Sequence, residues 1–278
     1  MILIDVTATQ DFVRDGFVLA KEAFSRDLAA ECRDLLWQQM EASPDDPATW
    51  TAPVVRLGYQ HGGPFEKAAN TQRLHEAYDA LVGAGRWLPR TDLGTFPVRF
   101  PSDDPPGDDG WHLDGSYPPN PPDSEADPFA WRVNIASRGR ALLMLFLLSD
   151  VGPDDAPTRI RVGSHLDVAR ALEPFGDDGL SMIDASVLAA EASRSRPVSL
   201  AIGEAGDVYL CHPFLVHAAQ AHHGSRPRFI AQPPLHLRGG TGASFDLLAA
   251  SSPVEQAIVQ ALQHSHVALA QVLDQPVE

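Results

Sequence analysis

Eight consecutive apolar residues, Ala141–Leu148, constrain the fold of this chain more than any other segment. The run is far shorter than the roughly 20 apolar residues that a membrane-spanning helix needs. Apolar and polar residues do not alternate along it, as they do in a strand with one face in water. The run therefore predicts a β-strand that is buried on both faces, so the rest of the chain must cover both sides.

The covering layers are predicted from the periodicity of the remaining segments. Apolar residues at helical spacing predict helices over 27–41, 66–82 and 253–273, and a short helix within 11–20 that runs into a strand at Phe17–Leu19. Shorter helices are predicted at 165–172 and 186–192, and strands at 96–100, 131–135, 159–162, 199–202, 207–211 and 229–237. This order favours a mainly β fold with flanking helices, and a jelly-roll of the cupin type closes two such sheets over a shared mouth.

Composition narrows the classes of function. The chain has 278 residues, of which 44% are hydrophobic, and this suits one large core and a single domain. Its net charge of −16 argues against binding to nucleic acid or to anionic membranes. Cys32 and Cys211 imply no disulfide framework, and residues 1–5 do not resemble a signal peptide. We therefore expect a soluble cytoplasmic protein that acts on a small molecule, in an oligomeric state that the sequence does not indicate.

Two distant segments carry residues that suit a metal site. His112 and Asp114 are two residues apart, so on an extended segment their side chains point to the same side. A histidine from a later strand, His217, would complete a set of two imidazoles and one carboxylate, which binds ferrous iron and leaves positions open for other ligands. Arg228 follows 11 residues after His217 and has the rigid donor fork that matches a carboxylate.

The order of these residues resembles that of the iron- and 2-oxoglutarate-dependent dioxygenases, and more narrowly the phytanoyl-CoA dioxygenase family. The spacings from Asp114 to His217 and from His217 to Arg228 are similar to those of that family. The resemblance runs from about residue 10 to about residue 235 and includes three further segments: Asp15–Val18, the strand 145–151 with Ala156–Thr158 after it, and Gly163–His165.

The resemblance implies a double-stranded β-helix at 96–240, with N-terminal helices (1–95) packed on it and a C-terminal helix at 253–273. It implies that His112, Asp114 and His217 are the catalytic metal ligands for Fe(II), that 2-oxoglutarate is the co-substrate with its far carboxylate on Arg228, and that O2 is the oxidant. Thr158 and Trp131 are weaker expectations as further co-substrate contacts.

Other histidines near His217 have other interpretations. His212 precedes a proline and could pack or form a hydrogen bond beside the metal site. His222 and His223 precede Gly224–Ser225 and are typical of a polar turn, and His165 is expected to support the turn after its strand.

Alternatives remain open at this point. Two histidines and an aspartate also suit a zinc hydrolase, and a jelly-roll that binds a metal or ligand without turnover is a further alternative. Neither needs Arg228 behind the metal. The carboxylate of Asp114 favours oxygenation over halogenation, because related halogenases have a small residue there. The substrate is not indicated. The segment 117–128 is predicted to be a lid, and its proline-rich part 118–128 is longer than the family pattern.

Overall fold

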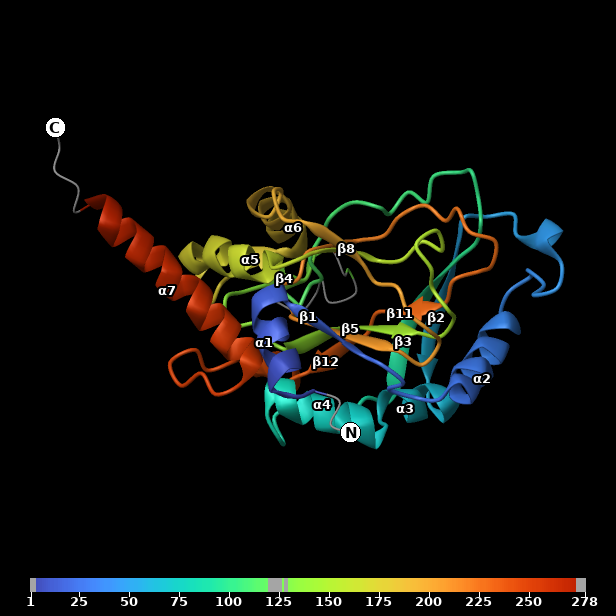
Figure 1. The fold of residues 1–278 in the computed structure, drawn as a ribbon, viewed down its shortest axis with the longest axis horizontal. Helices are drawn as coiled ribbons and strands as arrows, with labels where there is room; N and C mark the ends of the chain where they lie inside the picture. The colour runs from blue at the N-terminus through green and yellow to red at the C-terminus, as the bar shows by residue number, and fades with distance from the viewer. Residues whose placement is uncertain (1–3, 120–126, 128–129, 274–278) are drawn as a thin grey trace.

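Two antiparallel β-sheets form the centre of the computed structural model, which describes residues 4–119, 127 and 130–273 (Figure 1). The larger sheet has the order β1 (Phe17–Ala20), β9 (Val208–Cys211), β5 (Arg140–Leu147) and β11 (Ile230–Ala231), and β12 (Pro234–His236) also pairs with β5. The smaller sheet has the order β10 (His217–Ala218), β6 (Arg159–Arg161) and β8 (Val198–Leu200). Two further pairs are β2 (Val54–His61) with β3 (Asp92–Arg99), and β4 (Arg132–Val133) with β7 (Leu180–Ser181).

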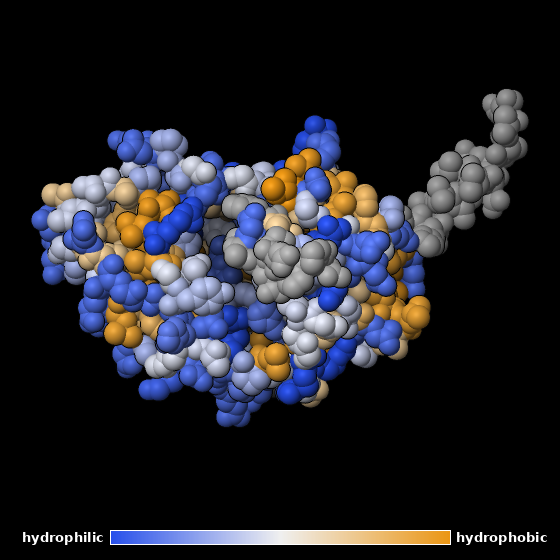
Figure 2. Space-filling view, turned by 180° about the vertical axis from the view of Figure 1, so that it is seen from behind, coloured by the Kyte–Doolittle hydropathy of each residue, from blue (hydrophilic) through white to orange (hydrophobic). Residues whose placement is uncertain are grey.

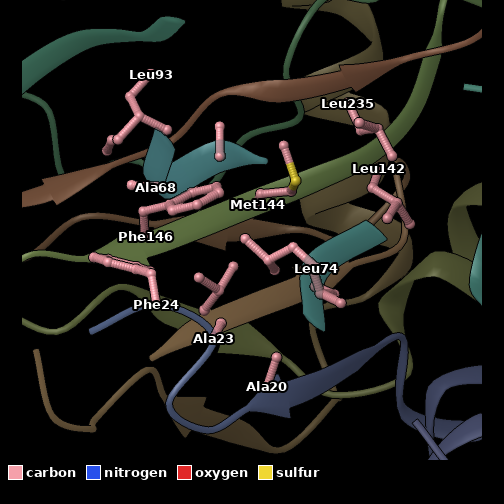
Figure 3. Close-up of a cluster of buried hydrophobic side chains, with 14 of the residues drawn as sticks. Ala20, Ala23, Phe24, Ala68, Leu74, Leu93, Leu142, Met144, Phe146 and Leu235 are labelled. Carbon is pink, nitrogen blue, oxygen red and sulfur yellow. The ribbon is translucent and has the colours of Figure 1, made fainter. Parts of the chain in front are cut away.

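Strand β5 is buried along its whole length, as the apolar run predicts. Leu143, Leu145 and Leu147 pack with Ile160 of the smaller sheet, which places them between the two sheets. The alternate residues Leu142, Met144 and Phe146 belong to a second cluster on the opposite face, where Phe24, Ala68, Leu74 and Leu235 meet them (Figure 3). Successive side chains of a strand point to opposite faces, so an unbroken apolar run serves both layers.

The N-terminal helices cover the outer face of the larger sheet. They are α1 (Val6–Asp15), α2 (Arg26–Trp37), α3 (Gly63–Ala69) and α4 (Gln72–Val82). The helix predicted over 66–82 is wrong as a single element, because Thr71 accepts a hydrogen bond from the Leu74 amide (3.2 Å) and so caps the start of a separate α4. Helix α1 begins at Val6 rather than near Asp11, since Asp5 caps it. Ser25 caps α2 by accepting a hydrogen bond from the Leu28 amide (3.1 Å).

Two of the remaining helices lie on the other side of the sheets, and the third lies at one end of the molecule (Figure 1). They are α5 (Ser164–Leu172), α6 (Met182–Ala192) and α7 (Pro253–Leu273), and they share an apolar cluster with Leu113 and Phe214. Helix α7 has the predicted bounds and begins with a capping box, in which Glu255 accepts from the Ser252 amide (2.9 Å). Its C-terminal part extends away from the body (Figure 1).

Several strands differ from the prediction. Strand β2 was not predicted, because its sequence mixes apolar residues with Arg, Gly, Gln and His and one of its faces is exposed. The segment around His112 is a single bridge to His217 and not a regular strand. The lid predicted at 117–128 lies mostly outside the described residues. Short 3₁₀ turns are found at Pro47–Thr49, Glu173–Phe175 and Gly240–Gly242.

The surface is mainly polar. Figure 2 shows hydrophilic residues over most of the face seen there, with separate hydrophobic patches between them. Within the described residues, no helix is long and apolar enough to cross a membrane.

Candidate active site

The segment that carries His112 and Asp114 is held from both sides. The His112 amide donates to the His217 carbonyl (3.0 Å) and the His217 amide donates back (3.2 Å), which adds the segment to the edge of the smaller sheet. On the outer side, Leu113 is fully buried, and its backbone N–H donates to Ser186 Oγ of α6 (3.1 Å). Because Leu113 points outward into this helix cluster, its neighbours His112 and Asp114 point the other way.

These two side chains converge with His217. One ligand atom from each of the three residues lies within 4.8 Å of the others. Asp114 Oδ1 is 4.0 Å from His112 Nε2 and 3.9 Å from His217 Nε2. The Nδ1 atoms face backbone carbonyls, of Gly110 for His112 (2.8 Å) and of Leu215 for His217 (3.1 Å). A proton on each Nδ1 therefore leaves the Nε2 lone pairs directed at one point, which is the tautomer that a metal ligand needs.

The electrostatics of the triad fit a divalent cation. Burial, and then the nearby His112 ring, lower the pKa of His217 to about 4, so its imidazole is neutral at neutral pH. Its Nε2 is buried and has no hydrogen-bond partner in the described part of the chain. Burial raises the pKa of Asp114, but Arg140 and then the two histidines outweigh this and bring it to about 2. Two imidazole nitrogens and one anionic carboxylate around an unsatisfied point are a suitable donor set for Fe(II).

Arg140 is a residue of this site that sequence reasoning missed. Its Nη1 donates to Asp114 Oδ2 (2.8 Å) and its Nη2 donates to the Gly115 carbonyl (2.8 Å). The guanidinium is buried at the start of β5. An arginine next to an apolar strand usually lies in solvent. The position of Arg140 in the sequence therefore does not indicate that it contacts Asp114.

Arg228 lies in a buried basic cluster with Arg99, and both residues are 2% exposed. Their backbones exchange two hydrogen bonds (2.8 and 3.1 Å), so the two side chains lie side by side on one face. Arg99 pairs with Asp108 (2.7 Å). Arg228 donates to the Ala156 carbonyl (2.8 Å), and its Nε has no partner among the described residues. Burial, and then Arg99, lower the pKa of Arg228 to about 9, so it is a charged and incompletely paired cation at neutral pH.

A cavity of about 550 Å³ reaches the Asp114 carboxylate of the triad. Asp114 lines it, together with Arg56, Tyr59, Thr95, Pro97 and Gln232. Arg228 approaches the Pro97 carbonyl (3.4 Å), and Gln232 donates to Thr158 Oγ1 (3.3 Å). Thr158, two residues after Ala156, is therefore near both Arg228 and the cavity wall. Trp131 lies beside the ligand segment, where its Cβ packs closely on Gly115.

Three other histidines make contacts within the scaffold and away from the triad. His212 is fully buried and bonds through Nε2 to the Val254 carbonyl (3.2 Å), so its hydrogen bonds do not support the triad. His165 approaches the Val13 carbonyl (3.0 Å), and His222 approaches the Arg226 carbonyl (2.8 Å) within its turn. The turn at 222–226 agrees with the prediction, although His222 is buried rather than exposed.

A jelly-roll with two histidines and one carboxylate at its mouth is the architecture of non-haem iron oxygenases. The family model described as Phytanoyl-CoA dioxygenase (PhyH) matches residues 12–230, and the chain belongs to this family. The match confirms the family predicted from the sequence and indicates the general class of an iron- and 2-oxoglutarate-dependent oxygenase. Among curated proteins, none matches the chain.

Solved structures confirm the predicted jelly-roll fold. A putative oxidoreductase from Salmonella typhimurium LT2 is 14% identical, with a TM-score of 0.54 over 86% of this chain and 72% of that one. The 2-oxoglutarate-dependent carbocyclase SnoK from nogalamycin biosynthesis is 17% identical, with a TM-score of 0.53 over 84% of each chain. HygX from Streptomyces hygroscopicus, solved with nickel, 2-oxoglutarate and hygromycin B, is 17% identical, with a TM-score of 0.52 over 87% of this chain and 97% of that one.

Proposed function

We propose that this protein is a hydroxylase that binds Fe(II) through His112, Asp114 and His217 and uses 2-oxoglutarate and O2 to oxidise a small organic substrate. When bound, the iron and its co-substrates supply the oxidant that converts a C–H bond of the substrate to C–OH, with release of succinate and CO2. The observation that supports the proposal most is the buried His217 Nε2, which has no partner in the described structure and points at the Asp114 carboxylate.

The protein contributes position and charge. His112 and His217 are held in one tautomer by backbone carbonyls, so their lone pairs do not have to reorganise when the metal binds. Arg228 is proposed to receive the far carboxylate of 2-oxoglutarate, because it is a buried cation whose Nε–H has no partner among the described residues and whose Nη2 contacts Pro97 of the cavity wall. The Asp108 carboxylate is shared by Arg99 and Arg56 and does not pair with Arg228, so the cluster keeps an excess of positive charge for the co-substrate carboxylate.

Thr158 and Trp131 have smaller proposed roles. The Thr158 hydroxyl is buried near Arg228 and accepts from Gln232, so its own proton is free to be donated to the co-substrate. Trp131, packed on Gly115, is proposed to form a wall beside Asp114. In this proposal the N-terminal helices (1–95), the core (96–240) and helix 253–273 act as one cytoplasmic domain.

The test is anaerobic addition of Fe(II) and then 2-oxoglutarate to the purified protein. We expect the weak visible charge-transfer band of the iron chelate, and we expect it to be lost in His217→Ala. Absence of the band at saturating ligand would contradict the proposal and favour a metal-binding jelly-roll without turnover. Hydrolytic activity with zinc alone would favour the zinc hydrolase.

A further inference from the structure

The two oxygens of the Asp114 carboxylate face different partners. Oδ1 faces His112 and His217 at 4.0 and 3.9 Å, whereas Oδ2 accepts a hydrogen bond from Arg140 at 2.8 Å. From this geometry we propose that Arg140 is a positioning residue that keeps Asp114 a one-oxygen ligand of the metal and so preserves a coordination position for the co-substrate. The inference rests on the proposed function.

Arg140 is held by contacts other than the one with Asp114. Its second nitrogen donates to the Gly115 carbonyl, so the guanidinium bridges two consecutive residues of the ligand segment. Its backbone begins β5 opposite His236 of β12, within the larger sheet. The residue before it, Gly139, has φ +82°, and a Cβ there would lie 2.8 Å from the Ser116 carbonyl oxygen. Only glycine fits this turn, which brings the start of β5 against the ligand segment.

Without this contact, Oδ2 would be free to bind the same cation. A carboxylate can bind with one oxygen or two, and its partners outside the metal shell decide which. A second bond from Asp114 would take one of the positions that the three-ligand arrangement leaves open. Arg140 also offsets the charge of Asp114, so the loaded metal site would attract the dianionic co-substrate more strongly with Arg140 than without it.

The test uses Mn(II), which gives a signal without turnover. Water proton relaxation measures Mn(II) affinity and the number of exchangeable waters on the bound ion, and addition of 2-oxoglutarate displaces those waters. In Arg140→Met we expect the relaxivity of the bound ion to fall by about one third, as three water positions become two. The affinity for 2-oxoglutarate should weaken about tenfold or more, while Mn(II) binding is retained.

Two further variants serve as controls. Arg140→Lys keeps the charge and one donor for Oδ2, so it should restore most of the wild-type relaxivity. Arg138→Met removes an exposed arginine of the same turn that donates to the Thr241 carbonyl (2.6 Å), and it should match the wild type in every reading. Circular dichroism checks that each variant folds. Should Arg140→Met not fold, Arg140→Gln asks the same question with a neutral side chain.

The outcomes separate the inference from the proposed function. Wild-type relaxivity and co-substrate affinity in folded Arg140→Met would overturn the inference and leave the proposed function standing. Loss of Mn(II) binding in that variant would also overturn it, because Arg140 would then be needed for binding itself and not for limiting Asp114 to one oxygen. Failure of the wild-type protein to bind Mn(II) would instead contradict the proposed function.

Discussion

Replacement of Arg228 by methionine tests the proposed co-substrate site most sharply. The guanidinium is 2% exposed, so water does not screen its interaction with a carboxylate. Asp108 pairs with Arg99 and Arg56 and not with Arg228, so Arg228 has no ion-pair partner among the described residues. Truncating one partner of a buried charged pair costs 2–5 kcal/mol. We take about 3 kcal/mol, which corresponds to about 150-fold weaker binding of 2-oxoglutarate.

The assay is anaerobic titration of the Fe(II) protein with 2-oxoglutarate, followed by the charge-transfer band. Arg226→Met is the matched control, since Arg226 is exposed and only two residues away, and it should bind 2-oxoglutarate like the wild type. 2-Oxopentanoate lacks the far carboxylate, so wild type and Arg228→Met should bind it equally. Thermal stability should not fall in Arg228→Met, because the substitution removes a desolvated charge. Affinity for 2-oxoglutarate within about twofold of the wild type, or an equal loss for 2-oxopentanoate, would refute the reasoning.

Two further predictions concern stability. Burial raises the pKa of Glu255, but Arg86 and the backbone amides at Ser251 and Ser252 outweigh this and bring it to about 2. The ionised carboxylate therefore contributes fully to the free energy of unfolding above pH 4.5, and this contribution is lost as the pH falls towards 2. Glu255→Gln should therefore lower the free energy of unfolding, measured in urea, by about 2 kcal/mol near pH 7; this value allows for screening at the partly exposed Arg86. A difference between variant and wild type that does not narrow towards about pH 3 would contradict the prediction. Mn(II) at about 100 times its dissociation constant should stabilise the wild type by about 2.7 kcal/mol and raise Tm by about 5 °C or more, and an equal rise in His217→Ala would count against the triad.

The parts of the fold that the sequence predicts well are those set by local pattern. The apolar run of β5 predicts burial on both faces because each face belongs to a different cluster. Ser25 predicts the start of α2, since a side chain that caps a helix leaves a local signal. Thr71 is a cap of the same kind, but it lies inside a longer apolar periodicity that conceals the break between α3 and α4.

The parts that the sequence does not predict depend on contacts between distant residues. Strand β2 has one exposed face and a glycine at position 58, so its pattern is too weak to indicate a strand without its partner β3. The spacing of His112, Asp114 and His217 indicates a shared site, and the structure brings them together. Arg140 and Arg99 acquire their roles only when β5 and β3 are placed beside the ligand segment and Arg228, which no spacing of residues encodes.

A crystal structure of the anaerobic protein soaked with Mn(II) and 2-oxoglutarate tests the central claim most directly. We expect one anomalous difference peak bonded to Nε2 of His112, Oδ1 of Asp114 and Nε2 of His217, with the far carboxylate of 2-oxoglutarate on Arg228. A peak at other side chains, or a co-substrate turned away from Arg228, would contradict the account.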